Sequence, residues 1–184
     1  AATRLCEGEL RQQAAVGSWG MSRQFYRQLL LQKTGALCSV SCQLGCWRAG
    51  GSRLQTQCLA RFGSQLGLAF QIHDDWLDYW GTEQVGKTLG TDLAQSKPTL
   101  PLIRLLETVP LEDRHRLIAQ LDSGDPAALA AVRSALARSD AARYTLSAAK
   151  ACSQRAQQQL TSLPPSAAKD CLIAVAEYSV RREV

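Results

Sequence analysis

Three aspartates and a glutamine form an acidic cluster near the middle of the chain. Gln71, Asp74, Asp75 and Asp78 are spaced i, i+3, i+4 and i+7, which places their side chains on one face of a helix. Like charges one turn apart repel by about 0.2–0.5 kcal/mol per pair, so a bound cation would relieve this helix. Mg²⁺ suits the site because it binds one or two carboxylates, keeps waters and accepts phosphate oxygens. The cluster therefore predicts a magnesium site with Asp74, Asp75 and Asp78 as ligands.

A solvated acidic helix end is the alternative interpretation of this cluster. Large apolar side chains alternate with the acids, namely Trp76, Leu77, Tyr79 and Trp80. A solvated helix face rarely carries so much aromatic area, because burying that area is strongly favourable. The aromatic residues therefore favour a site at the border of the core.

Lysines close to predicted bends supply charge of the opposite sign. The string from Gly81 to Thr88 matches the P-loop pattern G-x-x-x-x-G-K-[ST]. A P-loop follows a buried parallel strand, but this string follows a helix end in a chain without a predicted sheet. We therefore reject a P-loop, although Lys87 still suits phosphate as a point charge. With Lys33 and Lys97, it predicts a carboxylate–metal–diphosphate–lysine arrangement.

The elements that must position these residues are helices. Ala, Leu, Gln and Arg dominate, and no segment alternates β-branched residues with period two. We expect one all-helical unit over residues 1–184, with a change of direction at 33–35 and a loop at 81–97. The expected helices cover residues 3–16, 22–32, 36–48, 52–80, 98–107, 112–121, 125–137, 140–160 and 166–184.

Small residues mark a contact between two of the expected helices. Gly63 and Gly67 lie four residues apart, and so do Cys38, Cys42 and Cys46 in the preceding helix. The C-x3-C-x3-C spacing lacks the close chelating pairs of a zinc site, so we expect the thiols to pack against the glycine face. Six residues of the 52–80 helix form a predicted core-facing stripe: Phe62, Leu66, Ala69, Phe70, Leu77 and Trp80.

The overall composition argues against several classes of protein. The net charge is +5, from 21 Lys and Arg against 16 Asp and Glu, and the basic residues are scattered. This distribution suits an anionic ligand better than nucleic acid. No apolar run approaches the ~20 residues of a membrane span. The seven cysteines form no C-x-x-C pair, so we expect a cytoplasmic protein with reduced thiols, no nucleic-acid partner and no transmembrane segment.

The residues around the acidic cluster resemble those of a known family. The second aspartate-rich region of trans-isoprenyl diphosphate synthases, the polyprenyl synthetase family, is similar to Phe62-Gly63-x-x-Leu66-Gly67-x-Ala69-Phe70-Gln71-Ile72-x-Asp74-Asp75-x-Leu77-Asp78. The same block continues in register with Gly86-Lys87-x-x-Gly90-x-Asp92-Leu93 and Lys97-x-Thr99-Leu100-Pro101. The two preceding helices match at Cys6-Glu7-Gly8-Glu9, Lys33-Thr34 and Ser41-Cys42-x-x-Gly45. The resemblance covers about residues 5–105.

This resemblance implies a fold and a reaction. The fold would be an all-α helical bundle of the isoprenoid-synthase type, present as its C-terminal portion. The reaction would be the head-to-tail condensation of isopentenyl diphosphate with an allylic diphosphate, with Mg²⁺ as cofactor and a homodimer as the usual assembly. Asp74 would be the principal metal ligand of this motif, supported through waters by Asp75 and Asp78.

The resemblance also implies roles for the residues that bind substrate. Lys33 and Lys87 would contact the allylic diphosphate, and Lys97 would add positive charge at the mouth of the site. Thr34 and Gln71 would orient the reacting allyl group and the leaving oxygen near the isopentenyl partner. The catalytic set is then Lys33, Thr34, Gln71 and Asp74, and the substrate-binding set is Lys33, Gln71, Lys87 and Lys97.

Two departures from the family pattern qualify these expectations. Ser96 stands where the family usually has glycine before the lysine of the loop. The chain begins Ala1-Ala2-Thr3 and enters predicted helix at once, so we expect it to be the C-terminal part of a longer protein. The family's first aspartate-rich motif would lie upstream of Ala1, so activity is expected of the full-length protein and not of this chain alone. The alternatives are a non-catalytic helical subunit that regulates a complete prenyl synthase and a terpene cyclase, which the lysines disfavour.

Overall fold

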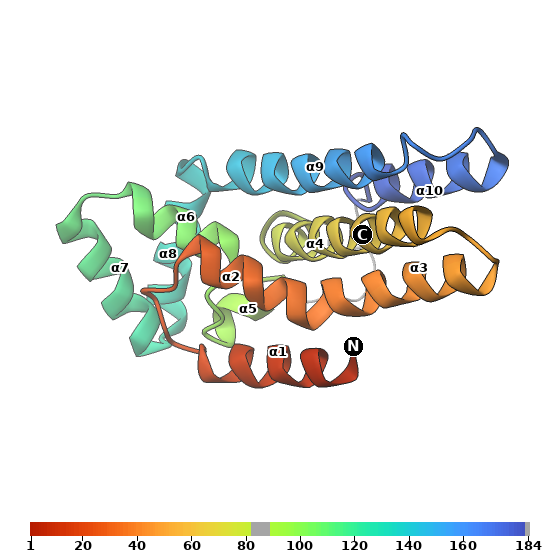
Figure 1. Cartoon of the computed structure of the whole chain (residues 1–184). Coiled ribbons are helices and arrows are strands. Elements are labelled where there is room, and N and C mark those ends of the chain that lie inside the picture. The colour runs from red at the N-terminus through yellow and green to blue at the C-terminus, as the bar shows by residue number, and fades with distance from the viewer. Residues whose placement is uncertain (82–88, 183–184) are drawn as a thin grey trace.

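The computed structural model describes residues 1–81 and 89–182 of the chain. These residues form a bundle of helices (Figure 1), and the described part contains no strand. The all-α fold expected from the sequence is therefore confirmed.

Most helical elements follow the order expected from the sequence with small shifts of their ends, but a short additional helix lies within the expected loop at 81–97, and the helix expected over 166–184 ends at Tyr178. The elements are α1 (Ala2–Ala14), α2 (Arg23–Leu30), the π-helical turn η1 (Leu31–Gly35), α3 (Ala36–Arg48), α4 (Arg53–Trp80), α5 (Thr91–Ala94), α6 (Leu100–Thr108), α7 (Leu111–Ser123), α8 (Pro126–Arg138), α9 (Ala141–Gln159) and α10 (Ala167–Tyr178). None of these described helices has the length and hydropathy that a membrane span requires.

The long helix α4 is the centre of the bundle. It packs between α3 and α9, and α10 packs against α9. Figure 1 shows α3, α4 and α9 running side by side, while α6, α7 and α8 gather at one end of the bundle. The acidic cluster lies in the C-terminal half of α4, so the central and best-supported helix positions it.

Side-chain caps fix the starts of several helices where the sequence predicted them. The Ser52 hydroxyl accepts a hydrogen bond from the Gln55 amide, and the Gln55 side chain accepts one from the Ser52 amide. This reciprocal capping box satisfies two backbone donors that a helix start leaves unpaired. Ser22 caps α2 and Asp125 caps α8 through single bonds of the same kind.

The predicted change of direction at residues 33–35 is instead a π-helical turn. The backbone stays helical from Leu30 to Ala36, so α2 continues through η1 into α3 (Figure 1). A π turn contains an extra residue and rotates the side chains that follow, and such turns are frequent at functional sites. The sequence correctly located the irregularity, but the expectation of two separate helices was wrong.

The predicted seam between glycines and cysteines is confirmed for Cys38 and Cys42, whereas Cys46 packs against Gly51 and not against the Gly63–Gly67 face. A Cβ on Gly67 would lie 3.0 Å from the Cα of Gly35, and a Cβ on Gly63 would collide with the Cys38 carbonyl oxygen. The Cys38 and Cys42 sulfur atoms fill the remaining space beside these glycines. All seven cysteines are free thiols. The small residues therefore let α3 approach α4 closely, which fixes η1 next to the acidic half of α4.

The core-facing stripe predicted on α4 is correct for all but one of its members. Phe62, Ala69 and Leu77 are buried, and Leu66 and Trp80 are partly buried. Phe70 is 41% exposed, and its ring lies 3.8 Å from the Arg182 guanidinium carbon. The prediction failed at Phe70, whose ring contacts the Arg182 side chain and stays partly exposed.

Candidate active site

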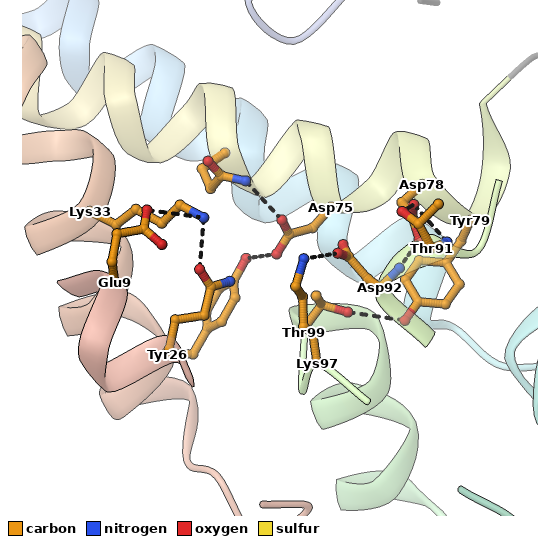
Figure 2. A network of polar contacts seen from close by, with 12 residues as sticks. Glu9, Tyr26, Lys33, Asp75, Asp78, Tyr79, Thr91, Asp92, Lys97 and Thr99 are labelled. Carbon is orange, nitrogen blue, oxygen red and sulfur yellow. Dashed lines mark hydrogen bonds and ion pairs between the residues drawn. The ribbon is translucent and has the colours of Figure 1, made fainter. Parts of the chain in front are cut away.

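The buried member of the acidic cluster is Asp75. It is 5% exposed, and its Oδ2 accepts a hydrogen bond of 2.6 Å from the Tyr26 hydroxyl. Its Oδ1 accepts a bond of 3.1 Å from the Gln71 amide nitrogen. Burial and the nearby Asp92 carboxylate raise the pKa of Asp75 to about 7, against the opposing effect of its two hydrogen bonds. Figure 2 shows Tyr26 and Asp75 pointing toward each other between α2 and α4.

Asp78 fixes the chain segment that follows α4. Its Oδ1 accepts hydrogen bonds from the Thr91 amide at 3.0 Å and the Thr91 hydroxyl at 2.6 Å, and its Oδ2 accepts one from the Asp92 amide at 3.1 Å. These are the first amides of α5, so the carboxylate acts as a distant N-cap. Gly90 precedes them with a left-handed φ of 76°. The expected loop at 81–97 therefore contains a short helix, because Asp78 supplies its cap from outside.

Asp74 contacts a residue near the C-terminal end of the described chain. Its Oδ1 is 3.4 Å from Nη2 of Arg182, and the Asp74 side chain is 32% exposed. The same Nη2 donates to the Phe70 carbonyl oxygen at 3.1 Å. No sequence pattern links residues 108 positions apart, so Arg182 could not have been identified before folding.

The π-helical turn brings Thr34 into contact with the acidic cluster, whereas Lys33 contacts α1. The Thr34 hydroxyl donates a hydrogen bond of 3.1 Å to Oε1 of Gln71, so these two predicted residues meet. The Lys33 ammonium turns toward α1, where it donates to Oε1 of Gln12 at 2.7 Å and lies 3.5 Å from Oε1 of Glu9. Figure 2 shows Lys33 beside Glu9.

Lys97 reaches the site from the segment after α5. Its ammonium lies 3.3 Å from Oδ1 of Asp92. Burial and the Asp78 carboxylate raise the pKa of Asp92, and Lys97 opposes this shift. A cavity of about 20 Å³, room for one water, is lined by Tyr26, Gln71, Asp75 and Lys97 among other residues. Lys97 therefore belongs to the site, whereas Lys87 lies outside the described residues.

Several residues of the site were not identified from the sequence, among them Thr91, which donates to Asp78. Tyr26 and Arg182 have no spacing relation to the aspartates that they contact. Gln12 lies three residues after Glu9 on α1, so helical spacing could have indicated that both would face the same neighbour. Gln12 and Tyr26 come from α1 and α2, and Arg182 lies beyond the end of α10, so each reaches the site through packing of separate segments of the chain.

The three aspartates do not converge on one point. Asp75 and Asp78 use both carboxylate oxygens as acceptors for protein donors. Across residues 1–81 and 89–182, no group of three His, Cys, Asp or Glu side chains could hold a metal ion. Asp74 is partly exposed, and Mg²⁺ needs as few as one carboxylate beside waters and phosphates, although a bound Mg²⁺ would have to displace Arg182 from this carboxylate. The metal assignment stays a prediction, and the structure favours Asp74 for it.

Comparisons with known proteins agree with the fold and with the resemblance. The Polyprenyl synthetase family model matches residues 1–138. The chain is 33% identical over 181 residues to a short chain isoprenyl diphosphate synthase of Methanothermobacter thermautotrophicus, covering 98% of this chain and 56% of that protein. It is 31% identical over 180 residues to heptaprenyl diphosphate synthase component 2 of Bacillus subtilis, covering 97% and 51%.

A solved structure with a similar fold is known. The polyprenyl synthase of Caulobacter crescentus, complexed with calcium and isoprenyl diphosphate, gives a TM-score of 0.89 at 29% identity, over 99% of this chain and 56% of that one. The chain thus spans about half the length of the curated relatives that it matches.

Proposed function

The chain belongs to the polyprenyl synthetase family, and from this premise we propose that it forms one wall of the active site of a trans-prenyltransferase. The reaction would join isopentenyl diphosphate to an allylic diphosphate. The carbon–oxygen bond of the allylic diphosphate breaks and its electron pair leaves with diphosphate. The double bond of the isopentenyl partner supplies the new carbon–carbon bond, and a proton is then lost.

One observation supports the proposal most strongly: a line of hydrogen bonds joins the π-helical turn to the acidic turn of α4. It runs from Thr34 through Gln71 to Asp75, directly beside Asp74. A polar line of this kind at the edge of an apolar bundle suits a substrate with an anionic head and an apolar tail. A helix packed only for stability gains little from buried polar groups at this position.

Each polar group of this wall has a proposed role. Asp74 would hold Mg²⁺, which when bound would offset negative charge on the diphosphate. Lys33 would bind the allylic diphosphate, moving from Glu9 and Gln12 to the stronger anion. Lys97 would raise the positive potential at the mouth, while Lys87 keeps its proposed role on the strength of the resemblance alone.

The full-length protein is proposed to contain further helices that complete the site. The α3 side chains Leu37, Leu44 and Trp47 are 52%, 54% and 68% exposed, and Phe70 of α4 is 41% exposed. Uncovered apolar side chains of this size favour a covering partner. The homodimer stays a prediction of the family resemblance, and the cytoplasmic location stays a prediction from the expected reduced thiols.

The test is coupling of labelled isopentenyl diphosphate to farnesyl diphosphate by the full-length protein. Asp74→Ala is expected to lower turnover at least ~10²-fold, on the scale of lost electrostatic stabilisation of a transition state. The matched control is Asp170→Ala, because Asp170 is an exposed aspartate of α10 outside the site. Near-normal turnover by Asp74→Ala would show that Asp74 is a surface residue without a role in the reaction. Robust turnover by the 184-residue chain alone would contradict the proposal that further helices are needed to complete the site.

A helical subunit of a larger synthase is the second candidate function. It is favoured by the Bacillus subtilis relative, whose name marks it as one component of its enzyme. If this chain only regulates a complete synthase, Asp74→Ala will leave the turnover of the assembly unchanged. The same variant therefore separates the two candidates.

A further inference from the structure

Asp75 is the member of the acidic cluster whose surroundings differ most from those of a metal ligand. Both of its oxygens accept hydrogen bonds, at 2.6 Å from Tyr26 and 3.1 Å from Gln71. Only 5% of the residue is exposed. A buried carboxylate is retained when specific donors compensate it, and two different helices supply those donors here.

An ionised Asp75 carboxylate sets the direction of two hydrogen bonds, the one from Gln71 to Asp75 and the one from Thr34 to Gln71. It can only accept, so Gln71 must turn its amide nitrogen toward Asp75. The Gln71 carbonyl oxygen is then turned toward Thr34, whose hydroxyl must donate across the 3.1 Å that separates them. Thr34 is left with an oxygen that can only accept further bonds, and Gln71 is left with one remaining amide proton to donate.

We propose that Asp75 is a positioning residue, which together with Tyr26 fixes the donor and acceptor directions of Gln71 and Thr34 toward the allylic substrate, and is not a metal ligand. The inference rests on the proposed function, since it concerns the two residues expected to orient the reacting groups. The three aspartates then have different roles, because Asp74 contacts Arg182 and would hold the metal, Asp75 sets the direction of the Gln71 amide, and Asp78 caps α5.

The critical variant is Asp75→Asn, which has the same shape but can donate as well as accept. Its amide could donate to Oε1 of Gln71, so Gln71 could rotate by half a turn and the direction of the line would be lost. Tyr26→Phe removes one donor but keeps the carboxylate, so Gln71 should keep its direction. Asp74→Asn is the matched comparison, because it makes the same chemical change one position earlier in the chain.

The first measurement follows the side-chain amide resonances of Gln71 in the ¹⁵N-labelled chain. Both Asp75 oxygens accept hydrogen bonds, from Tyr26 and from Gln71, so the Gln71 amide nitrogen is held toward Asp75. Asp75→Asn is expected to shift these resonances, while Asp74→Asn and Tyr26→Phe leave them near their wild-type positions. Unchanged resonances in Asp75→Asn would overturn the positioning role. This spectrum is informative even if the chain proves to have no part in prenyl transfer.

The second measurement separates orientation from metal binding in the full-length protein. Asp75→Asn is expected to lower kcat at least ~10-fold, because small misplacements of orienting groups reduce rates by up to about 10². Its affinity for the inert analogue farnesyl thiolodiphosphate with Mg²⁺ should stay within about twofold of wild type, whereas Asp74→Asn should weaken binding at least ~10-fold. Equal loss of Mg²⁺-dependent binding in both variants would show that Asp75 is a metal ligand. A wild-type protein without turnover or Mg²⁺-dependent binding would instead contradict the proposed function.

Discussion

Gly8 lies where α1 crosses the π-helical turn, and replacing it with alanine should disturb the residue that binds diphosphate. A Cβ at this position would lie 2.7 Å from the Lys33 backbone nitrogen and 3.0 Å from the Lys33 Cα and the Gln32 Cβ. Backbone atoms cannot rotate away as a flexible side chain can, so α1 itself must move. Because α1 carries Glu9 and Gln12, this movement would also release the Lys33 ammonium.

The size of the effect follows from two opposing contributions. Alanine is more favourable than glycine in a helix interior by about 0.8–1.0 kcal/mol. Overpacking in a close contact costs about 1–3 kcal/mol, and the contact with immobile backbone places Gly8→Ala near the upper end. We therefore expect Gly8→Ala to lose about 2 kcal/mol net. Gly45 of α3 has no atom within 4 Å of its added Cβ in the described part of the chain, so Gly45→Ala should gain up to about 1 kcal/mol.

Urea unfolding followed by circular dichroism measures both variants in the 184-residue chain. The midpoint should fall for Gly8→Ala and rise for Gly45→Ala at a constant m-value. The difference between the two isolates the contact with Lys33, because the helix propensity change is common to both. If Gly8→Ala were stabilised as much as Gly45→Ala, α1 would not lie against the π-helical turn. The contacts of Lys33 with Glu9 and Gln12 of α1 would then be wrong as well.

Two further changes test the segments that support the site. Ser96 has a left-handed φ of 53°, and this conformation costs a residue with a Cβ about 1–2 kcal/mol. Ser96→Gly should therefore raise the free energy of unfolding by up to about 1 kcal/mol, after the entropy cost of glycine is subtracted. A lower free energy of unfolding in urea would contradict the strain at Ser96. The Trp19 indole nitrogen donates to Asp122 at 2.7 Å, and Trp19→Phe should cost about 1–3 kcal/mol through lost bonding and packing. In a double-mutant cycle with Asp122→Ala, full additivity would show that the hydrogen bond contributes nothing.

Local patterns in the sequence were sufficient to predict most of the helices and the close contact of α3 with α4, but not the π-helical turn or the short helix α5. The capping box at Ser52 is a short-range pattern, and so is the glycine spacing that brings α3 against α4. Both depend on residues within a turn or two of each other, and their physical meaning does not change with the rest of the fold. The acidic cluster was located for the same reason.

The partners of that cluster could not be predicted in this way. Helical spacing shows that Asp74, Asp75 and Asp78 share one face, but it does not show that Tyr26, Thr91 and Arg182 meet them individually. Those partners come from three other segments, so the environment of each carboxylate depends on the packed fold. The exposure of Phe70 was missed for a related reason, because periodicity cannot show which side of a helix remains uncovered.

The central claim is that Asp74 and Lys33 form part of a magnesium-dependent diphosphate site. Calorimetric titration of the full-length protein with farnesyl thiolodiphosphate tests it most directly, with and without EDTA. We expect binding that requires Mg²⁺, is abolished by EDTA, and weakens at least ~10-fold in both Asp74→Ala and Lys33→Ala, since each removes a charge that faces the diphosphate. Binding of wild-type affinity in either variant, or binding that persists in EDTA, would contradict the site described for this chain.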